Sequence, residues 1–140
     1  MATASAGIRW SKLDNMPTKR VFSTAVEVDG NLYVVGGCDQ KGTPLDTFEC
    51  YNPRKRRWFR LANMPSKRAG VCVLAVGKKI VCLGGVNTSQ EPMDAVEIFD
   101  IEKKKWAGAE DGIETLKDRL LGLSGIVRGK FKKTEAFRQF

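Results

Sequence analysis

Cysteine is the residue type in this chain most able to do chemistry, because a thiolate is both a nucleophile and a metal ligand. The chain has four cysteines: Cys38, Cys50, Cys72 and Cys82. No two of them have the C-x-x-C spacing of a zinc or redox motif. It contains no histidine, so the usual general base and zinc ligand are missing and no Cys-His or Ser-His pair can form. We expect no catalytic residue, no metal and no cofactor, and we interpret the cysteines as small buried apolar residues in a reducing compartment.

Two glycine pairs, Gly36-Gly37 and Gly84-Gly85, are the other candidates for chemistry, as phosphate-binding loops. Neither lies in the G-x-x-x-x-G-K-[ST] pattern that such a loop requires. A glycine pair at the end of an inner strand also suits tight packing and dihedral angles that a Cβ forbids. We therefore predict that the chain is not an enzyme.

Basic residues form two clusters, 54–57 (RKRR) and 103–105 (KKK), in a chain with a net charge of +8. Such clusters can attract acidic partners or nucleic acid, and the first could act as a nuclear-import signal. No array of aromatic residues for base stacking accompanies them. We favour a solvated basic rim, and nucleic acid binding stays an alternative.

Three tryptophans recur at a constant interval, because Trp10, Trp58 and Trp106 are 48 residues apart. The same offset aligns further unusual residues without a gap, namely Met16-Pro17 with Met64-Pro65, Lys19-Arg20 with Lys67-Arg68, Gly36-Gly37 with Gly84-Gly85, and Glu49 with Glu97. Agreement of so many special residues in one register indicates duplication of a structural unit.

Each unit is expected to contain four short strands. In the first they are residues 23–28, 31–35, 47–51 and a strand centred on Trp58, with Asp29-Gly30 as a hairpin turn. In the second they are residues 70–76, 79–83, 95–99 and a strand that begins at Trp106. This pattern predicts an antiparallel all-β protein.

The repeated residues resemble the Kelch motif over about residues 8–107. They are Met16-Pro17, residues 32–37, 49–51 and Trp58, and their counterparts 48 residues later. Residues 36–39 and 68–71 are most similar to the kelch domain-containing protein 8 group. The resemblance implies one four-stranded blade per repeat, hence a partial β-propeller of two blades, and a role as a platform for protein interactions.

The resemblance also implies roles for single residues. Arg20 and Arg68 are expected to form buried ion pairs with Glu49 and Glu97 that fix blade geometry, with anion binding as the alternative. The expected structural residues are Arg20, Gly36, Gly37, Glu49, Trp58, Arg68, Gly84, Gly85, Glu97 and Trp106.

By position in the motif, one face of the blades is expected to carry partner-binding loops. The candidate residues are Lys19, Asp39, Gln40, Lys41, Lys67, Asn87, Thr88, Ser89 and Gln90. The alternative is that these are ordinary polar loops.

The predicted organisation has five parts: a disordered start at 1–7, an outer strand at 8–15 that closes the ring with the last blade, repeats at 16–63 and 64–109, and a basic amphipathic tail at 110–140. The spacing Asp111-x-x-Glu114 suits a helix start within a helical or irregular tail. This tail is expected to cover an open blade face, or alternatively to bind a membrane surface or a partner.

The leading hypothesis is a non-catalytic protein-binding scaffold, expected to be a truncated form of a longer propeller protein. The alternatives are a regulatory or non-functional truncation and electrostatic binding through the basic clusters. The partner is an unidentified protein, and self-association through open blade faces is possible. No apolar run approaches the roughly 20 residues of a membrane span, and a cytoplasmic or nuclear location is expected.

Overall fold

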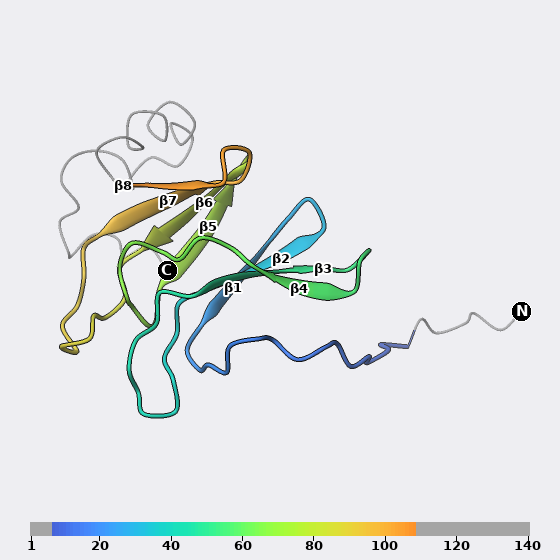
Figure 1. Ribbon diagram of the computed structural model, residues 1–140, viewed down its shortest axis with the longest axis horizontal. Helices are drawn as coiled ribbons and strands as arrows, with labels where there is room; N and C mark the ends of the chain where they lie inside the picture. Colours follow the sequence, from blue (N-terminus) through green and yellow to red (C-terminus); the bar gives the residue numbers. More distant parts are fainter. Residues whose placement is uncertain (1–6, 109–140) are drawn as a thin grey trace, which may run out of the picture.

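The computed structural model describes residues 7–108, which form two four-stranded antiparallel sheets (Figure 1). Blade 1 contains β1 (Thr24–Val28), β2 (Asn31–Val35), β3 (Phe48–Asn52) and β4 (Arg57–Arg60). Blade 2 contains β5 (Cys72–Val76), β6 (Lys79–Leu83), β7 (Val96–Asp100) and β8 (Lys105–Gly108). In each blade, neighbours in sequence are neighbours in the sheet. The all-β prediction is confirmed, and these strands begin within two residues of the expected positions.

The hairpin between β1 and β2 forms where the sequence pattern places it. Asp29 and Gly30 both have positive φ, 51° and 77°, as a two-residue turn that matches the twist of antiparallel strands requires. The turn pairs Val28 with Asn31 and thereby sets the register of β1 against β2. This register points one row of side chains towards blade 2.

Aromatic side chains fill the space between the blades. The rings of Phe48 in blade 1 and Phe99 in blade 2 lie 4.7 Å apart, edge to face. Trp106 packs against both, at 5.1 and 5.2 Å. Val35, Phe48 and Ile80 are at most 1% exposed. Because large aromatic surfaces give the greatest gain on burial, this cluster holds the two sheets together.

The glycine pairs lie where two backbones meet. Gly36 and Gly37 have φ of 62° and 93°, and a Cβ on Gly36 would lie 2.6 Å from the carbonyl oxygen of Arg68. The amide of Gly37 donates a hydrogen bond of 3.2 Å to that same oxygen. In blade 2, a Cβ on Gly85 would meet the Ala69 carbonyl oxygen at 2.6 Å. These positions therefore require glycine for both conformation and space.

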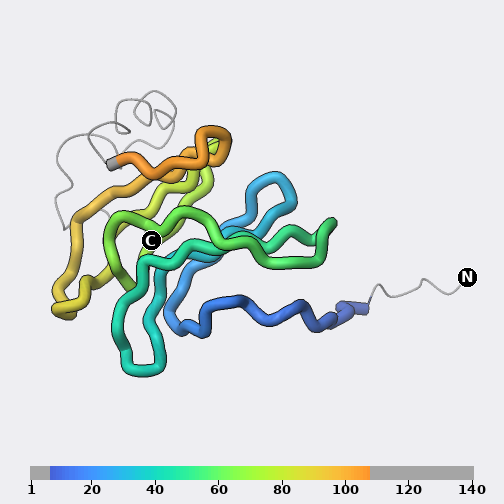
Figure 2. Tube along the Cα trace, viewed as in Figure 1, coloured from blue at the N-terminus to red at the C-terminus, as the bar shows by residue number. Residues whose placement is uncertain are grey.

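The strand expected near the start of the chain is not formed. Residues 7–16 make no ladder with another strand in the described structure, and Trp10 is 94% exposed (Figure 2, dark blue). By the repeat, these residues correspond to β4, which pairs with the third strand of its own blade. The matching third strand would belong to a further blade, and residues 7–108 contain none. The closing role of residues 8–15 stays a prediction.

Two other expectations have different outcomes. Cys38, Cys50 and Cys82 are buried, but Cys72 is exposed, so the prediction that all four thiols are buried is wrong. Cys72 lies on β5, the first strand of blade 2, where neighbours cover only part of the face.

The tail at 110–140 and most of the segment 1–7 lie outside the described residues. Within residues 7–108, the structure has no helix that could cross a membrane.

Candidate functional site

The connections between strands emerge alternately at two ends of the molecule. One end, which we call the loop rim, carries the long loops 36–47 and 84–95 together with residues 17–23 and 61–71. The other, the turn rim, carries the hairpin turns 29–30, 53–56, 77–78 and 101–104. In Figure 1 the turns lie at the upper and right side of the view and the long loops at the lower left.

Arg20 lies beneath the loop rim and is used inside blade 1. Its guanidinium pairs with Glu49, and its Nη1 donates to the carbonyl oxygens of Gly36 and Thr47, both at 2.9 Å. Thr18 donates its hydroxyl to the other Glu49 oxygen at 2.7 Å. The side chains of Arg20 and Glu49 are 0% and 1% exposed. The expected ion pair is therefore present, and this guanidinium is not open to an anion from solution.

Arg68 repeats the arrangement in blade 2. It pairs with Glu97 and donates to the carbonyl oxygens of Gly84 at 3.0 Å and Ala95 at 2.8 Å. Ser66 takes the place of the threonine and donates to Glu97 at 2.6 Å. Each arginine thus joins the segment before the first strand to the second and third strands. Their positions suit a structural role.

Asp39 and Asn87 hold the two long loops in shape. The Oδ1 of Asp39 accepts hydrogen bonds of 2.9 Å from the amides of Lys41 and Thr43. The Oδ1 of Asn87 accepts from the amides of Ser89 and Glu91 at 2.9 and 3.0 Å. The bond from the Thr43 amide is the main cause that lowers the pKa of Asp39. Both side chains organise their own loops, as such residues commonly do in turns.

The other candidate residues of the loop rim point into solvent. They are exposed side chains on both repeats: Lys19, Gln40, Lys41, Lys67, Thr88, Ser89 and Gln90. The structure places them all on one rim, as expected. It does not bring the two loops together, because Figure 1 shows their tips as separate projections. They frame a wide surface and do not converge on a small-molecule site.

Phe22 is a feature of the loop rim that sequence reasoning missed. It has a left-handed backbone with φ of 54°, and it is 74% exposed. Val21 beside it is 55% exposed. A bulky residue with positive φ is rare. The signal was present in the repeat, because the 48-residue offset aligns Phe22 with Gly70.

The turn rim carries the two basic clusters, as the repeat predicts. Residues 54–57 lie at the turn between β3 and β4, and residues 103–105 at the turn between β7 and β8. Lys78 of blade 2 forms an ion pair with Asp29 of blade 1 and links the two blades at this end. The positive charge of the described structure is therefore concentrated at one rim.

Family comparisons agree with the repeat. A model of the Kelch motif matches residues 19–65 and 67–109, more than half of the chain. Kelch domain-containing protein 8B of Homo sapiens is 50% identical over 40 residues, which are 29% of this chain and 11% of the relative. The Bos taurus protein of the same name is 46% identical over 50 residues, 35% of this chain and 14% of the relative. The matches span only a small part of these relatives.

The solved structure of YjhT shares the fold. It superposes with a TM-score of 0.63 over 72% of this chain and 41% of that chain, at 22% sequence identity. This likeness independently supports the arrangement of the two sheets. With two matched motifs, two four-stranded blades and the repeated arginine–glutamate pairs, the chain belongs to the Kelch-motif family.

Proposed function

We propose that this chain is a non-catalytic protein-binding module that contacts its partner through the loop rim. The observation that carries the proposal is the exposed, left-handed Phe22. Holding an aromatic residue in this backbone region costs on the order of 1–3 kcal/mol. The side chain gains little burial in return, so folding alone does not account for it. Exposed aromatic anchors are the residues that contribute most to protein interfaces.

The surroundings of Phe22 suit such an interface. Its carbonyl accepts a hydrogen bond of 3.2 Å from the amide of Gly70, so its backbone is tied to blade 2. The loops on either side are held by Asp39 and Asn87. A surface that is already ordered loses less entropy when a partner binds. The rim therefore combines an apolar centre with a polar, preorganised surround, the composition typical of interfaces.

The test is to replace Phe22 by the residue that the second repeat has at this position. Phe22→Gly keeps the left-handed backbone and removes the side chain. Partners that the full chain captures from cell extract should be depleted at least about tenfold for Phe22→Gly, since one anchor is worth ~2 kcal/mol or more. Leu74→Ala is the matched control, because Leu74 is an exposed apolar residue on β5, away from this rim. Equal capture by all three proteins would contradict the proposal.

A second candidate function is regulation by a shortened Kelch chain. The matches cover 11–14% of the length of the protein 8B relatives, and Trp10 and Ile8 are 94% and 86% exposed. Trp58 and Trp106, the repeat equivalents of Trp10, donate hydrogen bonds to the carbonyl oxygens of Asp14 and Ala62 respectively. The exposed Trp10 could insert into a longer relative or into a second copy of this chain.

Light scattering after size-exclusion chromatography separates the two candidates. A single monomeric species with strong near-ultraviolet circular dichroism supports the binding module. A mixture of sizes that becomes monomeric in Trp10→Ser supports the regulatory chain. Absence of enzymatic activity and a cytoplasmic location stay predictions under either function.

A further inference from the structure

We propose that the turn rim binds an acidic peptide segment that inserts one apolar side chain between the two blades. The proposal rests on the proposed function, protein binding, and adds a second site with a defined partner chemistry. It follows from two features that lie together: a pocket at the seam of the blades and the concentration of positive charge around it.

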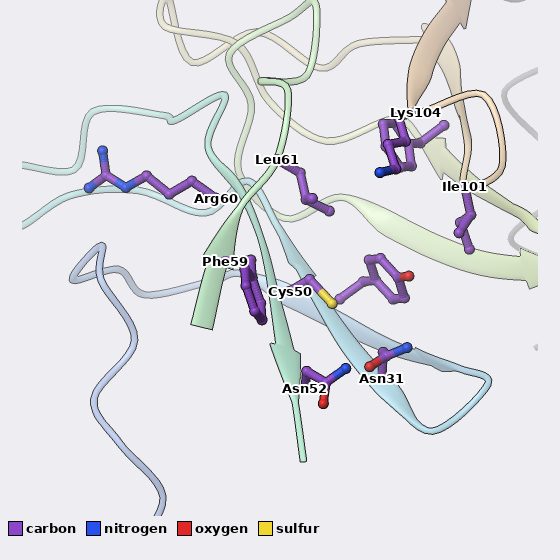
Figure 3. A pocket seen from close by; sticks show the side chains of 10 residues that line it. Asn31, Cys50, Asn52, Phe59, Arg60, Leu61, Ile101 and Lys104 are labelled. Atoms are coloured by element: carbon purple, nitrogen blue, oxygen red, sulfur yellow. The ribbon is translucent and has the colours of Figure 1, made fainter. Parts of the chain in front are cut away.

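The pocket has a volume of about 310 Å³ and lies at the seam of the two blades, where it extends from Asn52 and Lys104 at the turn rim to Leu61 (Figure 3). Blade 1 contributes Phe59 and Leu61 to its wall, and blade 2 contributes Phe99 and Ile101. Sites for whole small molecules span roughly 300–1,000 Å³, so this pocket is at the small end of that range. Its size and apolar walls suit one large side chain of a peptide.

Polar side chains also line the pocket. Asn31 and Asn52 lie on the blade 1 side and Lys104 on the blade 2 side (Figure 3). Tyr33 also lines the pocket, and burial raises the pKa of its phenol to about 12, so it carries no charge at neutral pH. The amides can bond to a peptide backbone, while the ammonium group can meet a carboxylate next to the inserted side chain.

The charge of the turn rim is strongly positive. The turns of this rim, counted with the strand residues that flank them (29–30, 52–57, 77–79 and 100–105), include nine lysines and arginines and three acidic residues, a net charge of +6. Two of the acidic residues are already used. Asp29 is paired with Lys78, and Asp100 accepts hydrogen bonds from the amides of Glu102 and Lys103. Opposite charges across an interface accelerate association and exclude wrong partners.

The loop rim does not share this charge. Arg20 and Arg68 are neutralised inside the blades. The remaining charged residues of the loops 17–23, 36–47, 61–71 and 84–95 number three basic and four acidic, a net charge of −1: Lys19, Lys41, Lys67, Asp39, Asp46, Glu91 and Asp94. An acidic segment is therefore directed to the turn rim and not to the opposite end.

Hydrogen bonds fix the backbone of the two turns that carry the basic clusters. Arg56 and Lys104 are repeat equivalents and have φ of 52° and 54°. The turn before β4 is closed by a hydrogen bond of 2.8 Å from the Lys55 amide to Asn52, and Asp100 accepts the equivalent bond from Lys103 at 2.9 Å. Turns fixed in this way need no further ordering of their backbone when a peptide binds, which lowers the entropic cost of binding.

An acidic peptide fits this rim better than nucleic acid does. Non-specific binding of single strands needs aromatic faces on which bases stack. Phe59 is covered by Lys55 and Arg57, whose charged groups lie 5.5 and 4.8 Å from its ring. In the described part of the chain, the highly exposed aromatic residues are Trp10 and Phe22, and neither belongs to the turn rim.

The test uses the full chain and two labelled nonapeptides in fluorescence anisotropy. One has eight glutamates around a central phenylalanine, and the other has serine at the centre. We expect the phenylalanine peptide to bind about tenfold more tightly, because it buries one large apolar side chain in the pocket. Lys104→Glu should weaken this binding at least about tenfold, because it reverses a charge in the wall of the pocket.

Lys41→Glu is the matched control, since it changes the net charge equally but lies on the loop rim; it should change affinity less than about twofold. Near-ultraviolet circular dichroism checks that both variants fold. Equal affinities for the two peptides, equal effects of the two variants, or tighter binding of a 20-nucleotide single strand than of the phenylalanine peptide would overturn the proposal. Loss of peptide binding with partner capture through Phe22 retained would leave the proposed function standing.

Discussion

Phe22 and Gly70 occupy equivalent positions in the two repeats and share one backbone conformation, with φ of 54° and 64°. The repeat geometry therefore imposes a left-handed residue at this point, whatever the side chain. Glycine adopts this region without a steric penalty, whereas other residues pay on the order of 1–2 kcal/mol. The first repeat has an aromatic residue at this position, whereas the second repeat has glycine, which adopts the conformation with less strain.

Phe22→Gly should therefore leave stability unchanged or raise it by up to about 1 kcal/mol, because relief of strain offsets the greater freedom of glycine in the unfolded chain. Urea denaturation followed by tryptophan fluorescence measures this. Destabilisation by more than about 1 kcal/mol would show that the ring supports the fold and is not held for a partner.

Two glycines with positive φ allow the cost of a steric clash to be separated from the cost of backbone strain. Gly36→Ala places a methyl group 2.6 Å from the Arg68 carbonyl oxygen and should cost about 3 kcal/mol or more, since it adds a clash to the strain of positive φ. Gly42→Ala is the control: its φ is 80°, but nothing lies within 4 Å of the added methyl group. It should cost only ~1 kcal/mol. Equal melting temperatures of the two variants would contradict this account.

The loop at Asp39 should respond to pH through a single group. Hydrogen bonds from backbone amides lower the pKa of Asp39 in the folded protein, that from Thr43 most strongly. Its contribution to loop order is therefore complete above the unfolded value of about 3.9 and is lost as pH falls through the lower folded pKa. The ¹⁵N-labelled Thr43 amide should show a titration with a midpoint below about 3.9.

Asp39→Asn gives the matched comparison, because Asn87 already performs this role in the second repeat without charge. In that variant the Thr43 amide signal should keep its folded position and lose the titration. Asp39→Ala should shift it at all pH values. A titration that persists in Asp39→Asn would assign the effect to another carboxylate.

The sequence predicted the fold well because residue types that are rare in the chain recur at the same positions of both repeats. Trp58 and Trp106, or Arg20 and Arg68, are rare residue types whose equal spacing specifies both the strands and their order. Contacts that depend on a second blade were harder to predict. The resemblance implies an outer strand at residues 8–15, but a strand forms only where a neighbour offers free hydrogen-bonding groups.

The candidate sites were predicted less completely. Position in the motif located the loop rim, yet it could not show that Asp39 and Asn87 direct their oxygens at their own loops. Phe22 is not a polar loop residue and so was not among the candidates, although the 48-residue repeat aligns it with Gly70. The pocket at the seam of the blades lies between Leu61 of blade 1 and Ile101 of blade 2, and no local sequence pattern encodes how closely two sheets approach.

Thiol reactivity tests the difference between Cys72 and the other cysteines. Cys72 is exposed on β5, whereas Cys38, Cys50 and Cys82 are buried. Burial also raises the pKa of Cys82 to about 12, which leaves almost no thiolate at pH 8. A disulfide reagent should therefore label one thiol quickly in the native protein and all four in urea. Cys72→Ser should remove the fast phase; fast labelling that survives in this variant would show that another thiol is accessible.

Loss of one member of the buried pair of Arg68 and Glu97 should destabilise the fold more than replacement of both members. Both side chains are at most 8% exposed, so Glu97→Ala leaves the guanidinium buried without its counter-ion and should cost about 3–5 kcal/mol. The double variant Arg68→Met, Glu97→Leu removes both charges and should recover much of that loss, since buried ion pairs are often no more stable than apolar replacements. Recovery will be incomplete, because the carbonyls of Gly84 and Ala95 lose their donor. Urea denaturation of the two variants measures the difference, and a double variant no more stable than Glu97→Ala would show that the hydrogen bonds of Arg68, and not its charge balance, hold blade 2 together.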